Sequence, residues 1–168
     1  YYIFSDDDLG QHMAELLMLK ARQGVKVRVL YDHVGSFSAS SRFFSRMRSA
    51  GVEAHPFFRV TFPQLANRIN FRNHRKTVVI DDTIGYIGGM NIASRYLRGQ
   101  SPSRTWRDTH IRVEGEAVAA LLYQFSVDWN FLKEDHHIVP LNPVPPLSPG
   151  VRRIPAQLIT SGPTDRWA

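Results

Sequence analysis

A short stretch near the middle of the chain carries residue types that bind and attack phosphate. His74 and Lys76 are separated by one residue, and Asn91 follows a Gly88-Gly89 pair. Side chains two apart on an extended strand face the same way, so the imidazole and the ammonium point together. The ammonium neutralises phosphate charge and favours a neutral, nucleophilic imidazole. We expect these three side chains, with the backbone at Gly89, to bind one phosphate.

Carboxylates at three positions are candidates for supporting roles. Asp108 starts a predicted strand, and we expect it to fix the tautomer of His74 and stabilise the imidazolium. Asp81 has the opposite strand parity to His74, which predicts a structural role in the hairpin and no contact with substrate. Asp32 ends a valine-rich strand, at the edge where open α/β sheets place ligands, and can line the site. The Asp-His-His cluster at residues 135–137 is more typical of a solvated helix end than of a metal site.

Composition limits the class of protein and its partners. The 168 residues are 43% hydrophobic and 21% charged, values typical of a soluble globular protein. No apolar run is long enough to predict a membrane span, and the absence of cysteine excludes disulfides and thiolate metal sites. The net charge of +6 fits a polyanionic partner, either nucleic acid or an anionic membrane surface.

The first 57 residues predict alternating strands and helices. Strands are expected at residues 1–4, 25–31 and 52–57, and helices at residues 5–24 and 40–50. Ser5 is the predicted start of the first helix, and Gly24 and Gly51 are the predicted stops. The alternation is typical of βαβ units, so we predict an α/β fold with a mixed, largely parallel β-sheet flanked by helices.

The second half predicts a hairpin, a strand and a long amphipathic helix. The hairpin strands are expected at residues 76–81 and 84–88 with Asp82-Thr83 between them, the next strand at 108–113 and the helix at 115–133. A proline-rich stretch and a further strand at 154–160 follow. We therefore predict a catalytic lobe at residues 1–137, a linker at 138–153 and the first strand of a second lobe within 154–168.

The pattern His-x-Lys-(x)4-Asp-(x)6-Gly-Gly-x-Asn, which runs from His74 to Asn91, resembles the signature of the phospholipase D superfamily. The flanking segments Tyr-Tyr-Ile-Phe at 1–4 and Trp-Arg-Asp-Thr-His at 106–110 extend the match. Together they make the chain similar to the first catalytic half of bacterial cardiolipin synthases. Many superfamily members have serine where Gly89 stands, whereas glycine is common in this subfamily.

This resemblance implies a two-lobed α/β enzyme with one motif in each lobe and the active site between them. One histidine attacks phosphorus to give a phosphohistidine, and the other protonates the leaving alcohol and then activates the acceptor. A phosphatidyl group passes in this way from one phosphatidylglycerol to another. The resemblance implies that His74 is the nucleophile, that Lys76 and Asn91 hold phosphate and that Asp108 orients the histidine. It implies no cofactor and no metal, because lysine and amide donors stabilise the charge.

Because the motif occurs once in this chain, three functions remain open. We favour one half of a cardiolipin synthase that acts with a second lobe on phosphatidylglycerol at an anionic membrane surface, without a nucleic-acid partner. The full-length protein would then be associated with the bacterial cell membrane, with its catalytic part in the cytoplasm. The second function is a homodimeric phosphodiesterase or nuclease in which two copies of His74 face each other. The third is a non-catalytic module that binds phosphate or lipid headgroups.

Overall fold

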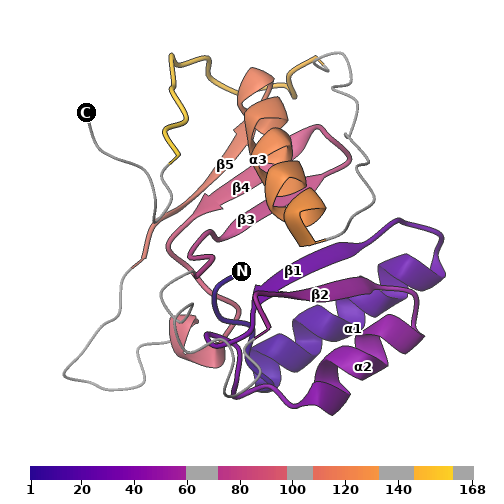
Figure 1. Cartoon of the computed structure of the whole chain (residues 1–168). Coiled ribbons are helices and arrows are strands. Elements are labelled where there is room, and N and C mark those ends of the chain that lie inside the picture. Colours follow the sequence, from indigo (N-terminus) through magenta and orange to yellow (C-terminus); the bar gives the residue numbers. More distant parts are fainter. Residues whose placement is uncertain (60–71, 98–107, 133–145, 161–168) are drawn as a thin grey trace. The chain divides into compact units, whose positions relative to one another are not determined.

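The chain divides into two compact units that are discontinuous in sequence. A computed structural model describes residues 1–59, 72–97, 108–132 and 146–160 (Figure 1). The first unit comprises Tyr1–Lys76 and Gly89–Thr109, and the second comprises Thr77–Gly88 and His110–Ala168. Helices and strands occur in both units, which confirms the predicted α/β class.

The first unit contains a parallel strand pair and two α-helices. Its elements in chain order are α1 (Asp8–Arg22), β1 (Arg28–Asp32), α2 (Ser41–Ser49), β2 (Glu53–Phe57) and the 3-10 helix η2 (Ser94–Tyr96). Strand β1 pairs in parallel with β2, and Asp32 at the carboxyl end of β1 is opposite Phe57. The predicted strand–helix–strand order is therefore confirmed, with the parallel pairing confined to these two strands among the described elements.

The helix boundaries follow from their caps. Asp7, not Ser5, is the N-cap of α1, and its carboxylate accepts hydrogen bonds from the Gly10 N–H at 3.0 Å and the Ser94 N–H at 2.8 Å. The prediction that Ser5 starts this helix was wrong, because Ser5 donates its N–H to the Ile92 carbonyl at 2.9 Å and stays extended. A carboxylate that satisfies two backbone donors stabilises the later start.

The predicted bounds of α2 and the predicted glycine stops are confirmed. Ser40 is the N-cap of α2, and its hydroxyl accepts a hydrogen bond from the Phe43 N–H at 3.1 Å. Gly24 follows α1 with φ of 88°, and Gly51 follows α2 with φ of 94°. Residues with a Cβ rarely adopt this left-handed conformation, so glycine ends both helices efficiently.

Residues 1–4 are extended, but they form a single β-bridge, Phe4 to Ile92, and no strand. The Asp32 N–H donates to the Tyr1 carbonyl at 2.9 Å, and the Ile92 N–H donates to the Ile3 carbonyl at 3.1 Å. The segment is therefore bound to the end of β1 on one side and to the residue after Asn91 on the other. This pairing brings the chain start to two of the predicted site residues.

Aromatic and aliphatic side chains from both helices pack against β1 and β2 to form the core of the first unit. The Tyr31 ring stacks on the Phe44 ring at 3.6 Å, and Phe4 packs edge-on against Phe43 at 5.4 Å. Burial of such side chains contributes about 1.5–3 kcal/mol each, so this cluster anchors the segments that carry the site. The buried members are Phe4, Ala14, Met18, Val27, Tyr31, Phe43, Phe44, Met47, Val52, Ala54 and Ile92.

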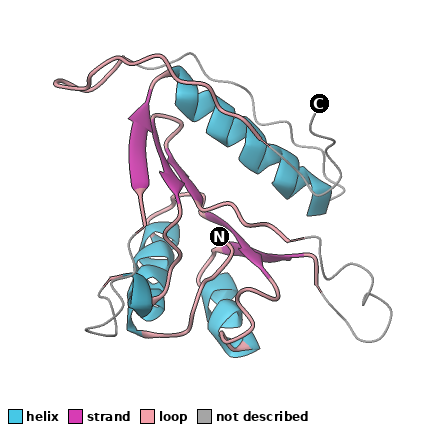
Figure 2. Ribbon diagram, turned by 90° about the vertical axis from the view of Figure 1, so that its left-hand side faces the viewer, coloured by secondary structure: helices cyan, strands magenta, loops and turns pink. Residues whose placement is uncertain are grey.

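The second unit is an antiparallel sheet with one helix packed on it (Figure 2). Its elements are β3 (Thr77–Ile80), β4 (Ile84–Gly88), β5 (His110–Glu114) and α3 (Glu116–Leu132). Gly85 allows the helix to approach, because a Cβ at this position would lie 2.7 Å from Leu121 Cδ1. The hairpin and the long helix are thus confirmed. The predicted strand at 108–113 begins two residues later, at His110, and leaves Asp108 outside the sheet.

The β3–β4 turn is centred on Asp81 and Asp82, one residue earlier than predicted. Their φ angles are 50° and 55°, and the Thr83 N–H donates to the Ile80 carbonyl at 3.1 Å. Two successive positive φ angles are characteristic of the type I′ turn that suits a two-residue hairpin connection. Asp81 is therefore an exposed turn residue and not a strand residue on the face opposite His74.

The C-terminal part of the described chain, residues 146–160, contains neither helix nor strand. The strand predicted at 154–160 is therefore absent. Ser148 donates its N–H to Glu114 Oε2 at 2.8 Å, which attaches this segment to β5. The Asp-His-His cluster at 135–137, the linker up to residue 145 and residues 161–168 lie outside the described ranges. Among the described residues, no helix is long and apolar enough to span a membrane.

Candidate phosphate-binding site

The first unit contains every predicted site residue except Asp81, which lies in the second unit. His74 and Lys76 belong to a segment without helix or strand that leads into β3. The remaining members of the site are contributed by the end of β1 and by residues 89–91 and 108. Segments far apart in sequence thus supply groups to one compact unit, as the motif predicts.

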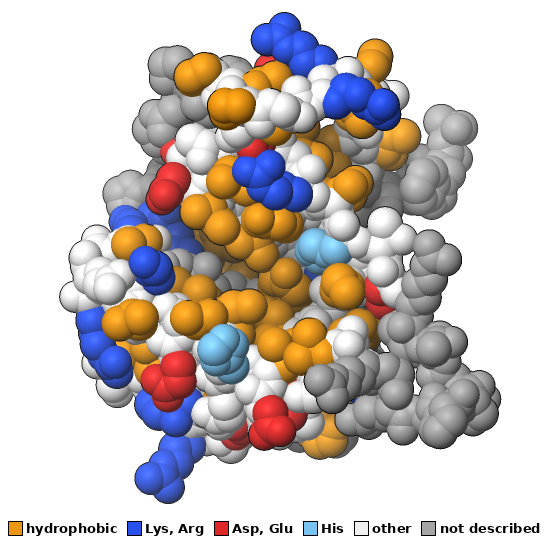
Figure 3. Space-filling model, turned by 180° about the vertical axis from the view of Figure 1, so that it is seen from behind, with side chains coloured by type: hydrophobic (Ala, Val, Ile, Leu, Met, Phe, Trp, Pro, Cys, Tyr) orange, Lys and Arg blue, Asp and Glu red, His pale blue; other side chains and the backbone are white. Residues whose placement is uncertain are grey.

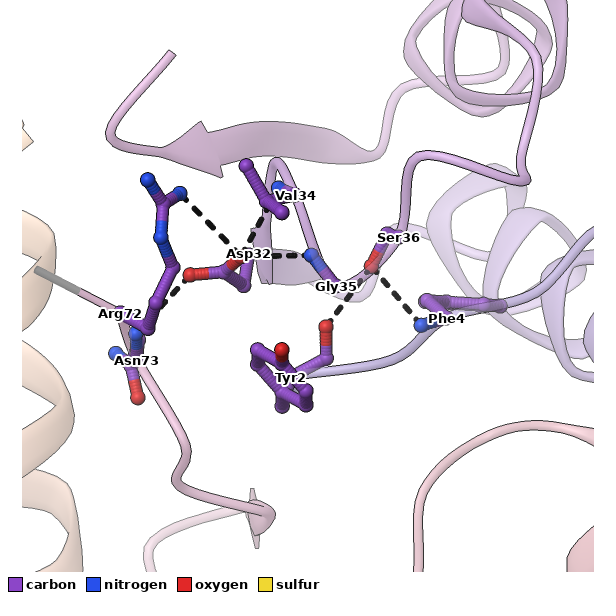
Figure 4. A network of polar contacts seen from close by, with 8 residues as sticks. All are labelled: Tyr2, Phe4, Asp32, Val34, Gly35, Ser36, Arg72 and Asn73. Carbon is purple, nitrogen blue, oxygen red and sulfur yellow. Dashed lines mark hydrogen bonds and ion pairs between the residues drawn. The ribbon is translucent and has the colours of Figure 1, made fainter. Parts of the chain in front are cut away.

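Asp32 is the buried centre of a polar network (Figure 4). Its Oδ1 accepts hydrogen bonds from the Val34 N–H at 2.9 Å and the Gly35 N–H at 2.8 Å. Its Oδ2 accepts from the Asn73 N–H at 3.1 Å, and Arg72 Nη1 lies 3.7 Å from Oδ1. The carboxylate, with no exposed surface, therefore connects the loop after β1 to the residue before His74.

Asn73 shapes the segment that presents the histidine. It is buried, and its side-chain Oδ1 accepts a hydrogen bond from the Arg75 N–H at 3.1 Å. This contact is an Asx turn, which bends the chain around the intervening residue. With Asn73 fixed to Asp32, His74 is left exposed at the outside of the bend. Sequence reasoning did not assign a role to Asn73, although asparagine before the histidine is a typical turn signal.

Tyr2 contacts both principal site residues. The His74 imidazole stacks on the Tyr2 ring with centroids 3.8 Å apart and an interplanar angle of 27°. The Lys76 Nζ lies 5.3 Å from the centroid of the same ring, and it also donates to the His74 carbonyl. The imidazole and the ammonium therefore gather at one aromatic ring, which agrees with the prediction that they point together. Tyr2 was missed, because nothing in the local pattern distinguishes it from Tyr1.

The electrostatics of the pair favour a neutral imidazole. Desolvation, followed by the field of Lys76, lowers the pKa of His74 from its ordinary value, while the field of Asp32 opposes this shift. Desolvation also lowers the pKa of Lys76, and the field of Asp108 opposes that shift. A neutral imidazole beside an ammonium is the protonation state required of a nucleophile that attacks an anionic phosphodiester.

Gly89 leaves space for Asp108. In the β4–β5 pairing, Gly88 is opposite His110, and the Gly89 N–H donates to the Thr109 carbonyl at 2.9 Å. This register brings Asp108 so close that a Cβ on residue 89 would lie 2.2 Å from Asp108 Oδ1. A side chain at position 89 would therefore have to displace the carboxylate. The glycine of the motif is explained by this contact.

The two acidic residues act on different partners. The field of Asp108 acts on Lys76, whereas that of Asp32 acts on His74. Asp32 was predicted only to line the site, and its role in the structure is to hold the backbone around His74. The orientation of His74 by Asp108 remains a prediction.

The Asn91 amide is used inside the protein. Asn91 is buried, its Oδ1 accepts from the Ile3 N–H at 2.9 Å, and its Nδ2 donates to the Tyr96 hydroxyl at 2.7 Å. An amide nitrogen carries two hydrogens, and the contact with Tyr96 uses one of them. Asn91 therefore fixes the chain start in place, and its contact with phosphate remains a prediction.

The arrangement provides part of the chemistry of phosphodiester transfer. It offers a nitrogen of the type that acts as a nucleophile, a cation for the phosphate oxygens and one buried carboxylate, Asp32, that fixes the surrounding backbone. Transfer also requires an acid to protonate the leaving oxygen. The residues predicted for this site are of the types that the nucleophilic side of such a reaction needs.

Comparison with known proteins connects this geometry to a family. Residues 1–129 match the family described as "Cardiolipin synthase, PLD-like domain". The chain is 45% identical over 167 residues to the cardiolipin synthase of Geobacillus kaustophilus, and the match covers 99% of this chain and 33% of that protein. It is 40% identical over 168 residues to the major cardiolipin synthase ClsA of Bacillus subtilis, covering 99% of this chain and 35% of that protein.

A third relative, cardiolipin synthase 2 of Bacillus cereus, is 42% identical over 167 residues, with 99% of this chain and 32% of that protein covered. The chain thus spans about a third of the length of the curated relatives it matches. The matched region includes the whole of the site described above.

Proposed function

Because this chain belongs to the phospholipase D-like domains of cardiolipin synthases, we propose that it contributes one half of the active site of a phosphatidyltransferase. The observation that carries the proposal is the exposed His74 imidazole, whose pKa is lowered and which shares the Tyr2 ring with the Lys76 ammonium. This pair has the protonation states and the accessibility that attack on a phosphodiester requires.

In the proposed first step, His74 attacks the phosphorus of phosphatidylglycerol. The new P–N bond forms as the P–O bond to the glycerol headgroup breaks, and the departing oxygen takes a proton from a second imidazole. Lys76 neutralises charge on the non-bridging oxygens, and the second Nδ2 hydrogen of Asn91 donates to one of them. The product is a phosphatidyl group attached to His74 and free glycerol.

In the second step, the headgroup hydroxyl of another phosphatidylglycerol loses its proton to the second imidazole. Its oxygen then attacks phosphorus, the P–N bond breaks, and His74 leaves as a neutral imidazole. The product is cardiolipin, and both imidazoles regain their starting protonation states. A low pKa makes His74 a better leaving group in this step.

The second imidazole is proposed to come from another phospholipase D-like lobe. The relatives are about three times as long as this chain, which leaves room for such a lobe in them. An anionic membrane is the proposed surface on which the substrate is met. In support, Tyr123, Val127 and Phe131 are exposed at four-residue spacing on α3. Figure 3 views the chain from behind, away from α3, and shows hydrophobic side chains exposed beside lysine and arginine there too, a combination suited to anionic lipid.

The proposal is tested by following conversion of phosphatidylglycerol to cardiolipin and glycerol in vesicles with the full-length protein. His74→Ala is expected to lower the rate at least about a thousandfold, since nucleophile and general-base losses cost this order of magnitude. His12→Ala is the matched control, because His12 is exposed on α1 and has no assigned role. Equal cardiolipin formation by the two variants would refute the assignment of His74.

A further inference from the structure

His74 lies in a segment with little backbone order of its own. Residues 72–76 form neither helix nor strand, and β3 begins only at Thr77. The His74 side chain is exposed, so core packing does not select its rotamer. A nucleophile needs a defined approach to phosphorus, and small misplacements of a reacting group are costly. The orientation of this imidazole must therefore come from specific side-chain contacts.

Tyr2 supplies such a contact, and the loop after β1 in turn fixes Tyr2 through a hydrogen bond to its carbonyl (Figure 4). Its carbonyl accepts a hydrogen bond from the buried Ser36 hydroxyl at 3.2 Å, and the same hydroxyl oxygen accepts from the Phe4 N–H at 3.0 Å. The Tyr2 ring lies against Gly35, where a Cβ would be 2.8 Å from the ring atoms Cδ2 and Cε2. Gly35 is in turn fixed by its hydrogen bond to Asp32.

Space, and not backbone conformation, explains the glycine at position 35. Its φ lies outside the left-handed region, so other residues can adopt its backbone conformation. A Cβ at this position would also lie 2.2 Å from the Tyr2 carbonyl oxygen, a backbone atom that cannot rotate away. The loop after β1 is therefore shaped to accept the Tyr2 ring.

We propose that Tyr2 is a positioning residue for the reaction at His74. Its ring holds the imidazole by stacking and keeps the Lys76 ammonium beside it, while Gly35 and Ser36 fix the ring from the protein side. The role rests on the function proposed above, in which His74 attacks phosphorus. Tyr2 acts through the His74 ring on which it stacks, it makes and breaks no bond, and its hydroxyl has no part in the role.

Two substitutions separate the ring from the hydroxyl. Tyr2→Phe keeps the stacking surface and is expected to keep kcat within about twofold of wild type. Tyr2→Leu fills part of the space without a ring. Its kcat is expected to fall about three- to tenfold, which is the rate ratio that corresponds to the stacking energy of one aromatic pair. KM for phosphatidylglycerol in vesicles should change little in either variant, because Tyr2 orients the nucleophile and does not bind substrate.

The titration of His74 by NMR gives a second readout that does not depend on turnover. In wild type, the ring protons of His74 should show an upfield ring-current shift from Tyr2, with the signal assigned by its loss in His74→Asn. The pKa of His74 should rise towards its ordinary value in Tyr2→Leu, since removal of the ring exposes the imidazole to water. Tyr2→Phe should titrate as wild type does.

The outcomes distinguish this role from the proposed function. Absence of the ring-current shift in wild type, or identical His74 titrations in all three proteins, overturns the role of Tyr2. Equal kcat for the Phe and Leu variants also overturns it. If wild type forms no cardiolipin, the proposed function fails, while the NMR titration still decides whether Tyr2 positions His74. Should Tyr2→Leu not fold, the ring-current shift in wild type and Tyr2→Phe decides.

Discussion

Replacement of Asp32 by asparagine tests whether the buried carboxylate holds the site together. In Asp32→Asn, one oxygen can still accept from Val34 and Gly35, but an NH2 group now faces the Asn73 N–H. A charge-assisted hydrogen bond contributes roughly 1.5–3 kcal/mol, and removing one member of a buried ion pair costs about 3–5 kcal/mol. The Arg72 side chain is still 10% exposed, whereas that of Asp32 is fully buried. We therefore take the lower end of the ion-pair range, about 3 kcal/mol, as the cost in free energy of unfolding.

The expected result is a fall in melting temperature of about 6–12 °C, from roughly 2–4 °C per kcal/mol for a chain of this size. Asn73 also loses its anchor, so the bend that presents His74 loosens, and kcat should fall about tenfold. The measurements are thermal unfolding of this 168-residue chain and cardiolipin formation by the full-length protein.

Glu53→Gln is the matched control, because it alters another arginine–carboxylate pair that differs in burial. Arg28 Nε and Glu53 Oε2 are 3.8 Å apart, and their side chains are 25% and 34% exposed. Such pairs contribute at most about 1 kcal/mol. If Asp32→Asn and Glu53→Gln change the melting temperature equally and leave kcat unchanged, the reasoning about the Asp32 network is refuted.

Three further predictions concern the motif itself. Gly89→Ala should push the Asp108 carboxylate away, because the added Cβ would overlap it. We expect kcat to fall about tenfold and the free energy of unfolding to fall by about 1 kcal/mol. In a double-mutant cycle with Asp108→Asn, additive effects of the two substitutions would contradict this contact. In the pH profile of kcat/KM, activity should be lost as pH falls through the pKa of His74, because the neutral imidazole is the reactive form. Since that pKa is lowered, the midpoint of this acid limb should lie below pH 6.5. A midpoint above pH 6.5 would show that another group titrates. Asp81 has a φ of 50°, which glycine adopts easily and valine does not. Asp81→Gly should therefore preserve stability and kcat, whereas Asp81→Val should lower the free energy of urea unfolding by about 1–2 kcal/mol and leave kcat unchanged. A low kcat in Asp81→Gly would mean that the carboxylate serves the reaction.

Local signals in the sequence predicted most of the fold. Glycine stops after the first two helices, the serine cap of α2 and the β-branched runs were sufficient to locate these elements. The misplaced start of α1 has a long-range cause, since Asp7 prevails over Ser5 through its bond to Ser94. The hairpin turn is centred on Asp81 and Asp82 because both turn residues need a positive φ, which aspartate adopts more readily than the β-branched Thr83.

The chemistry-bearing residues were predictable, whereas their supports were not. His74, Lys76 and Asn91 are identified by residue type and spacing, which a single sequence displays directly. Tyr2 and Asp32 reach the site through tertiary contacts at sequence separations of 72 positions, to His74, and 41 positions, to Asn73. No periodicity or spacing rule encodes such contacts, so their roles required the folded structure.

Residues Thr77–Gly88, between the two halves of the motif, form a hairpin that belongs to the second unit. This arrangement decides which insertions the motif can tolerate. The two halves of the motif lie at the base of one hairpin, whose strands close a short loop at little entropic cost. Their proximity is therefore decided at the base and is independent of what happens at the tip. Paired insertions around Asp81 and Asp82 would lengthen the hairpin and preserve the alignment, whereas a single insertion in one arm would reverse the facing of every residue beyond it. The tip is thus a position where a fluorophore or an epitope can be introduced without disturbing the predicted site residues at the base.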